Sequence, residues 1–135
     1  MKPLKVLILD DEPIVGRQLK RTLTRYGLDV EIFEKPDEAI ARIEETKFDV
    51  VVSDIRMKGI DGLQVLDYVR ARSMRTKVII ITGYTSRDVE TEALAKGAFD
   101  FIAKPFKPRD LLLVINKAAG ALGRVESESA RDIEL

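Results

Sequence analysis

Short apolar runs alternate along the chain with longer segments in which apolar residues recur at helical spacing. Three of the runs are continuous and rich in β-branched residues, a pattern typical of strands that are buried on both faces of a parallel sheet. Two further strand segments each carry an acidic residue, Glu31 in one and Asp100 in the other, which favours the two edges of the sheet. The buried runs are residues 6–9, 50–52 and 78–81, and the edge segments are residues 29–34 and 99–103.

A helical segment follows each of these five strands. The first has apolar residues at positions 15, 19, 23 and 26, and Gly27 follows where a left-handed cap is expected. Pro36 and Pro108 open the second and the last helix, since proline is favoured at the first helical position. Apolar positions 65, 66 and 69 mark the third helix, and positions 89, 93 and 94 mark the fourth, which ends near Gly97. This alternation predicts a doubly wound α/β domain with five parallel strands and right-handed crossovers.

The length of 135 residues is that of one domain, and a hydrophobic content of 45% is sufficient for a buried core. The composition becomes polar after Gly120. We therefore expect a domain over residues 1–120 and a polar tail, or the start of a linker, over residues 121–135. The apolar runs are too short to span a bilayer and the amino terminus shows no secretory signal, so we expect a cytoplasmic protein without membrane contact.

Cysteine and histidine are both absent from the chain. Their absence excludes disulfides, thiol nucleophiles, Ser-His-Asp triads and metal sites with cysteine or histidine ligands. The 23 basic and 23 acidic residues give a formal net charge of zero, which argues against nucleic acid as a partner. The available chemistry is that of carboxylates, hydroxyls and lysines, whose oxygen atoms suit a hard cation such as Mg²⁺.

Polar side chains follow four of the five predicted strands. The carboxyl ends of parallel strands meet at one edge of the sheet, where open α/β domains bind their ligands. Aspartates gathered there repel one another unless a divalent cation or Lys104 offsets their charge. Each residue alone is also typical of an ordinary helix start, turn or solvated surface, and only the set indicates a site. The residues at these strand ends are Asp10-Asp11-Glu12, Asp54, Thr82 and Lys104.

This set of residues favours phosphoryl transfer. An ionised carboxylate can attack phosphorus and become an acyl phosphate without a general base, in keeping with the absence of histidine. Magnesium, a lysine and a hydroxyl supply the charge neutralisation that the equatorial oxygens of the transferred group need.

Four motifs in this order resemble the receiver (CheY-like) domain of two-component response regulators, over residues 4–120. The resemblance implies a flavodoxin-like sheet with strand order 2-1-3-4-5 and a phosphoacceptor domain that switches protein contacts. Each motif is weak alone, whereas the ordered set at these spacings is specific. The motifs are Leu9-Asp10-Asp11-Glu12-Pro13, Ser53-Asp54-Ile55-Arg56-Met57 followed by Asp61-Gly62, Ile81-Thr82-Gly83-Tyr84, and Lys104-Pro105-Phe106.

The resemblance implies that Asp54 is the phosphoacceptor. It would take a phosphoryl group from a sensor histidine kinase or a phosphotransfer protein in a reaction that depends on Mg²⁺. Asp11 and Asp54 would hold the metal directly, with help from the backbone carbonyl of Arg56, and Asp10 would act partly through water. The domain is then no enzyme in the usual sense, since self-catalysed phosphotransfer and autodephosphorylation are its only expected reactions.

The resemblance implies further roles at the ends of the fourth and fifth strands. Thr82 would hydrogen-bond one phosphoryl oxygen and Lys104 would pair with another. The Lys104-Pro105 peptide bond is expected to be cis, and Gly83 is small where a larger side chain would block the phosphoryl group. Thr82 and Phe101 are the implied switch residues, because in this family the hydroxyl moves toward the phosphoryl group while an aromatic residue turns inward. Phe101 has no hydroxyl, and an ordinary role in the hydrophobic core is an alternative explanation for an apolar residue at this position.

Three positions bear on how closely this chain follows the family. Lys58 stands where proline is common in the family and adds a cation close to the site. Arg56 and Tyr84 flank the implied phosphoryl group, so we expect them to alter the lifetime of the acyl phosphate, in either direction. The family also implies a possible homodimer through the fourth helix, the fifth strand and the fifth helix.

Two alternatives use similar residues. An Mg²⁺-dependent phosphatase with an aspartate nucleophile needs a second aspartate two residues later, where this chain has Arg56. A flavodoxin-like cofactor domain needs a loop rich in glycine and hydroxyl groups after the first strand, where this chain has three acids that repel phosphate.

Overall fold

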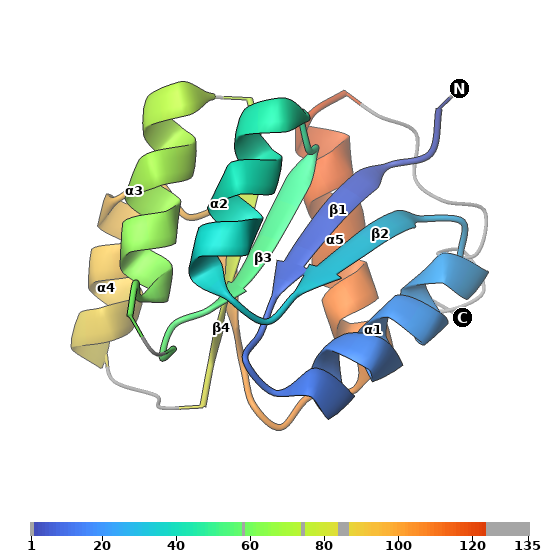
Figure 1. The fold of residues 1–135 in the computed structure, drawn as a ribbon, viewed down its shortest axis with the longest axis horizontal. Coiled ribbons are helices and arrows are strands. Elements are labelled where there is room, and N and C mark those ends of the chain that lie inside the picture. The colour runs from blue at the N-terminus through green and yellow to red at the C-terminus, as the bar shows by residue number, and fades with distance from the viewer. Residues whose placement is uncertain (1, 58, 74, 84–86, 124–135) are drawn as a thin grey trace.

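The computed structural model describes residues 2–57, 59–73, 75–83 and 87–123. These residues form a five-stranded parallel sheet in the order β2-β1-β3-β4-β5, which confirms the predicted topology (Figure 1). The two strands predicted to lie at the edges, β2 and β5, do so. The strands are β1 Lys5–Leu9, β2 Asp29–Phe33, β3 Val50–Asp54, β4 Lys77–Thr82 and β5 Asp100–Ala103.

Helices cover both faces of the sheet. Helices α1 and α5 share one buried cluster with the sheet, whereas α2, α3 and α4 contribute to the other. In Figure 1, α2 lies in front of the sheet and α5 behind it. The helices are α1 Pro13–Arg25, α2 Pro36–Glu45, α3 Gly62–Arg72, α4 Arg87–Ala95 and α5 Pro108–Ala121.

The alternation of side chains along β1 divides the core into two layers. Val6 and Ile8 point toward α1 and α5, and Leu7 and Leu9 point toward the opposite layer. All four side chains are fully buried, which is the reason that the central runs are apolar at every position rather than at alternate ones.

Proline and glycine set the ends of several helices, as predicted for Pro36, Pro108, Gly27 and Gly97. Pro13, Pro36 and Pro108 occupy the first helical positions of α1, α2 and α5. Gly27 and Gly97 follow α1 and α4 with φ angles of 85° and 99°, a region that side chains with a Cβ rarely adopt.

Charged side chains protect the exposed edge at β2. Both carboxylate oxygens of Glu31 accept hydrogen bonds from Arg42, at 2.7 and 3.0 Å, and Lys5 lies 3.4 Å from the same carboxylate. These bonds join the edge strand to α2 and β1, and the charges discourage pairing with another strand.

Differences from the predicted boundaries are small. Strand β2 ends at Phe33 and β5 begins at Asp100, each one residue inside the predicted segment. Helix α5 continues to Ala121, one residue past the predicted domain end.

Lys58, Tyr84 and residues 124–135 lie outside the described residues. None of the described helices has the length and apolar character that crossing a bilayer requires.

Candidate phosphoacceptor site

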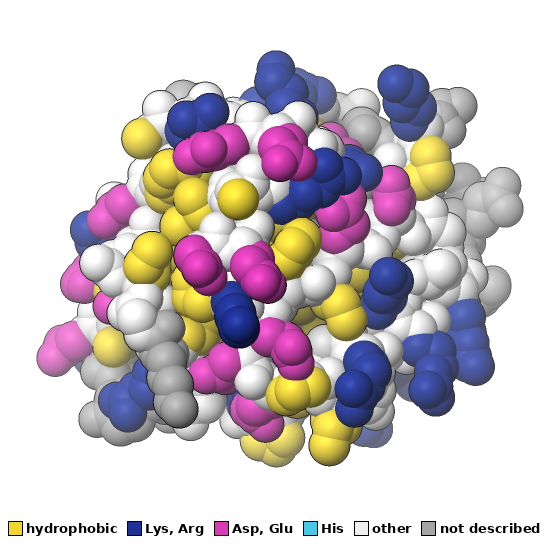
Figure 2. Space-filling model, viewed as in Figure 1, with side chains coloured by type: hydrophobic (Ala, Val, Ile, Leu, Met, Phe, Trp, Pro, Cys, Tyr) yellow, Lys and Arg dark blue, Asp and Glu magenta, His cyan; other side chains and the backbone are white. Residues whose placement is uncertain are grey.

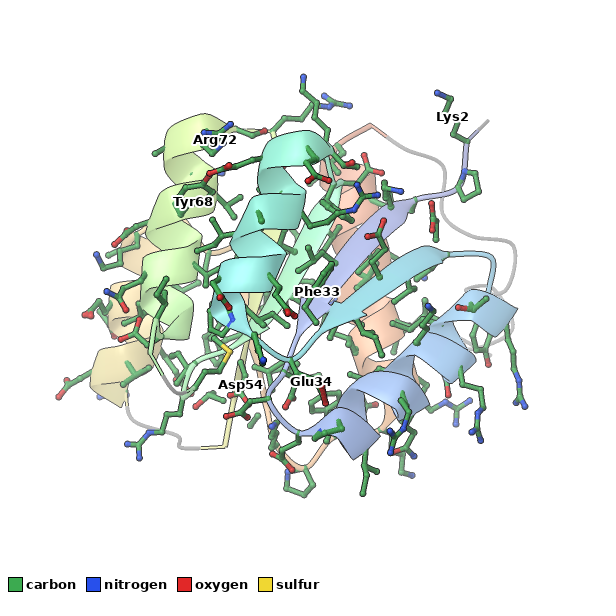
Figure 3. All side chains as sticks on the ribbon, viewed as in Figure 1. Lys2, Phe33, Glu34, Asp54, Tyr68 and Arg72 are labelled. Carbon is green, nitrogen blue, oxygen red and sulfur yellow. The ribbon has the colours of Figure 1, made fainter. Side chains whose placement is uncertain are left out.

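The sheet brings the predicted polar residues to the edge formed by the carboxyl ends of its strands. The backbone N–H of Lys104 donates to the carbonyl oxygen of Thr82 at 2.8 Å, which fixes the end of β5 beside the end of β4. Figure 3 shows Asp54 at this edge, with Glu34, which follows β2, on the neighbouring side. Asp10 follows β1, Asp54 and Thr82 end β3 and β4, and Lys104 follows β5.

The ammonium group of Lys104 lies among three carboxylates. Its Nζ is 2.9 Å from Asp54 Oδ2, 2.9 Å from Glu12 Oε1 and 3.1 Å from Asp10 Oδ2. The side chains of Asp10 and Asp54 are 0% and 8% exposed, whereas that of Glu12 is 61% exposed. Two buried carboxylates and one solvated carboxylate therefore share a single cation.

Asp10 is the most deeply buried acid of this group. Its Oδ1 accepts a hydrogen bond from the backbone N–H of Glu12 at 2.9 Å. Its Oδ2 is within ion-pair distance of Lys104 without a well-directed hydrogen bond. Burial raises the pKa of the Asp10 carboxyl above its ordinary value, although the Glu12 N–H and the Lys104 ammonium both lower it.

The same carboxylates hold the proton on Lys104. Burial alone lowers the pKa of this lysine, but the hydrogen bonds that it donates to Asp54 and Glu12, together with the nearby Asp10 carboxylate, outweigh burial, and the net pKa is raised well above its ordinary value. Lys104 is therefore a permanent cation at any physiological pH, available to an anionic group that arrives at Asp54.

Three carboxylates at this edge form a group suited to a hard cation. One oxygen each from Asp10, Glu12 and Asp54 lies within 4.8 Å of the other two. Hard divalent cations prefer such oxygen ligands. Asp11, predicted as a direct ligand, is exposed and lies outside this group, and the side chain of Arg56 is also exposed. Figure 2 shows acidic side chains gathered at this edge and over the amino end of α2.

The backbone that carries Asp54 is held by a close approach of α3. A Cβ atom at Gly62 would overlap the carbonyl oxygen of Asp54 and lie 2.8 Å from the Cα of Ile55. The backbone N–H of Gly62 donates to the carbonyl oxygen of Ile55 at 2.9 Å. The side chain of Asp61 caps α3 through a capping box with Gln64. The Asp61-Gly62 pair thus starts α3 directly against the loop that follows Asp54.

The segments after β4 and β5 complete the edge. Thr82 is 1% exposed, and a Cβ atom at Gly83 would lie 3.9 Å from the Lys104 Cδ atom, an ordinary contact distance. The Lys104-Pro105 peptide bond is cis, as predicted. Phe101 is partly buried and packs against the core cluster shared with α2, α3 and α4.

A groove lies beside this site, between α1 and the segment after β5. It has a volume of about 250 Å³, with Glu12 and Lys104 on one wall. Val15, Leu19 and Phe106 provide apolar lining. Four basic residues of α1 are exposed, namely Arg17, Lys20, Arg21 and Arg25.

Sequence reasoning missed the contact between Glu12 and Lys104. The three consecutive acids were recognised, but the spacing gives no sign of which one turns toward a lysine 92 residues away in the sequence. The buried amide of Asn116 was also missed, because its position in α5 reads as a break in an otherwise apolar face.

The matches to known proteins agree with this arrangement. The family model for the response regulator receiver domain matches residues 6–116. The chain is 33% identical over 130 residues to the DNA-binding transcriptional regulator NtrC of Salmonella typhimurium, covering 96% of the chain and 27% of that protein. It is 35% identical over 114 residues to the regulatory protein AtoC of Escherichia coli, covering 84% of the chain and 25% of AtoC. The chain thus spans about a quarter of the length of these relatives.

Solved structures match the chain over nearly their whole length. The beryllofluoride-activated NtrC4 receiver domain dimer is 34% identical, with a TM-score of 0.84 and coverage of 90% of this chain and 99% of that chain. The chemotaxis protein CheY4 of Vibrio cholerae is 31% identical, with a TM-score of 0.81 and coverage of 86% and 98%. Because the family model matches residues 6–116, which is most of this chain, the chain belongs to the response regulator receiver domain family.

Proposed function

We propose that Asp54 is the phosphoacceptor of this receiver domain. The observation that carries the proposal is the environment of its carboxylate, which is 8% exposed at the end of β3 and hydrogen-bonded at 2.9 Å to Lys104. Lys104 is thus already positioned to neutralise an anion that reaches Asp54, while the remaining carboxylate oxygen is left to act as a nucleophile.

The proposed reaction is a simple displacement at phosphorus. An oxygen of the Asp54 carboxylate forms a bond to phosphorus, and the bond between phosphorus and the donor's bridging atom breaks. The leaving group keeps that electron pair, so the step needs no oxidant, reductant or general base. Thr82, which ends β4, and Lys104, which follows β5, then bind oxygens of the transferred group.

We propose Mg²⁺ as the cofactor, because the donor set consists only of oxygen atoms and includes two buried carboxylates. Asp54 and Asp10 would hold it together with Asp11, Glu12 or the backbone carbonyl of Arg56. When bound, the cation supplies positive charge that offsets the negative charge of the transferred group. Lys104 offsets the same carboxylates in its absence.

Signalling is the proposed outcome of the modification, and a sensor histidine kinase or phosphotransfer protein is the proposed donor. The acyl phosphate would bias an existing equilibrium between two states through Thr82 and Phe101. We propose a second copy of the domain as a possible partner, since the solved NtrC4 receiver domain is a dimer. The contact surface that we propose consists of α4, β5 and α5. We further propose a cytoplasmic receiver domain over residues 1–120 that makes no direct contact with nucleic acid, with a tail or linker after it.

The phosphatase alternative is not favoured. The family match is to receiver domains, and the position two residues after Asp54 is the exposed Arg56 rather than an acid. Self-catalysed phosphotransfer and autodephosphorylation are therefore the reactions we propose for the domain.

Intact-mass spectrometry after incubation with Mg²⁺ and acetyl phosphate tests the proposal. We expect the gain of one phosphoryl group, lost under basic conditions and absent in Asp54→Asn. A matched control is Asp100→Asn, which removes an aspartate from the start of β5. Absence of a mass gain in the unaltered protein, or an equal gain in Asp54→Asn, would contradict the proposal.

A further inference from the structure

Glu12 occupies the start of α1 but does not serve the helix as a cap. It is the N-cap residue, and its side chain makes no hydrogen bond to the free N–H groups of the first turn. The short side chains of Asp, Asn, Ser and Thr ordinarily make such a bond at this position, whereas the longer glutamate is not a preferred capping residue. The Glu12 carboxylate extends instead to Lys104, where Oε1 accepts a hydrogen bond from Nζ at 2.9 Å.

This contact uses part of the hydrogen-bonding capacity of Lys104. The ammonium group has three N–H donors, and its hydrogen bonds to described residues go to Glu12 and Asp54, with Asp10 in ion-pair distance. A phosphoryl oxygen that approaches Asp54 needs one of these donors. The bond to Asp54 lies in a buried setting, whereas Glu12 is solvated and is the partner most readily exchanged.

On the basis of the phosphoacceptor function proposed above, we propose that Glu12 is a positioning residue that competes with the phosphodonor for Lys104. Its carboxylate holds the ammonium group in the unphosphorylated protein, and a donor's phosphoryl oxygen must replace it. Glu12 thereby slows phosphorylation of Asp54 by small anionic donors that have no other contact with the protein.

The displacement itself is unchanged by this competition. An Asp54 oxygen bonds to phosphorus, the bond from phosphorus to the bridging oxygen of acetyl phosphate breaks, and acetate leaves with the electron pair. Only the hydrogen bond of Lys104 is exchanged, from the Glu12 carboxylate to a phosphoryl oxygen.

The test is the second-order rate constant for phosphorylation by acetyl phosphate at fixed Mg²⁺. We expect Glu12→Gln to raise this constant about two- to fivefold, the range that an exposed ion pair can supply. Glu38→Gln is the matched control, since Glu38 is exposed and lies in a groove at the same edge with no ion pair to Lys104 among the described contacts. We expect this control to react as the unaltered protein does.

A double-mutant cycle separates competition for Lys104 from direct repulsion of the donor. If Glu12 acts through Lys104, then Glu12→Gln has no effect on the rate constant in a Lys104→Met background. An equal increase in both backgrounds contradicts the competition, as does a rate constant unchanged by Glu12→Gln in the unaltered background.

A second measurement does not depend on the reaction. In the protein without metal or donor, the side-chain NMR resonance of Lys104 should shift in Glu12→Gln and stay in place in Glu38→Gln. No shift in Glu12→Gln would also overturn the inference. Failure of the phosphoacceptor proposal is distinguishable, because the unaltered protein would then gain no phosphoryl group on Asp54.

Discussion

The Lys104 ammonium group lies 2.9 Å from Asp54 Oδ2 and joins the end of β5 to the end of β3 across the intervening strand. The two residues are 50 positions apart in the sequence. The contact depends on β4, which lies between the two strands. The backbone N–H of Lys104 donates to the carbonyl oxygen of Thr82 at 2.8 Å. On the other side of β4, the backbone N–H of Ile55 donates to the carbonyl oxygen of Ile81 at 2.9 Å. The sheet therefore brings these two side chains together.

Replacing Asp10 with asparagine should stabilise the fold near neutral pH. Burial raises the pKa of Asp10, so the folded protein holds a charged carboxylate there at a cost. The folded state binds the proton of such a carboxyl more tightly than the unfolded state does. The free energy of unfolding therefore falls as the pH rises from the ordinary pKa of aspartate to the raised pKa of Asp10 in the folded protein. We expect Asp10→Asn to have the higher urea midpoint near neutral pH. The gain should shrink as pH falls toward the pKa of Asp10, and a gain that grows on acidification would contradict this account.

Added Mg²⁺ should raise the melting temperature of the protein, because a ligand that binds only the folded state stabilises it by mass action. We expect the increase to be lost in Asp54→Asn and reduced in Asp10→Asn. The same measurement on Asp11→Asn and Glu12→Gln decides which of the two exposed acids is a ligand. Thermal unfolding with and without MgCl₂ at constant ionic strength is the measurement, and Glu38→Gln, which lies outside the acidic group, should keep the full increase.

The fold and most of the site follow from sequence patterns with a simple physical cause. Uninterrupted β-branched runs mark strands buried on both faces, and parallel strands carry their end residues to one edge, which brings Asp54 and Lys104 together. The orientation of side chains within the acidic triplet does not follow in this way. Glu12 turns toward Lys104 while Asp11 remains exposed, within a segment that is extended before α1, with φ −94° and ψ 106° at Glu12. Neighbouring residues of the same charge carry no pattern that reports this difference.

Substitution of Gly62 with alanine should destabilise the fold and disturb the site. The new Cβ would overlap the carbonyl oxygen of Asp54 and lie 2.8 Å from the Cα of Ile55. Both neighbours are backbone atoms, so relieving the overlap requires a shift of the main chain, which costs free energy. We expect a loss of about 1–3 kcal/mol in the free energy of unfolding, the usual cost of overpacking, together with slower phosphorylation of Asp54. Gly120→Ala is the matched control. Apart from the backbone of α5 itself, no described residue lies within 4 Å of a Cβ there, so this change on α5 should be neutral or stabilise by up to about 1 kcal/mol.

Replacing Asn116 with leucine should stabilise the protein. The Asn116 side chain is 4% exposed on α5, and neither its amide nitrogen nor its amide oxygen has a hydrogen-bond partner among the described residues. A buried polar group without a partner costs about 1–3 kcal/mol, and leucine has a similar shape without that cost. We expect a higher urea midpoint for Asn116→Leu with an unchanged m-value, and a lower midpoint for Asn116→Asp, which places a charge in the same position. A fall in the midpoint of Asn116→Leu would indicate that the amide is bonded in solution.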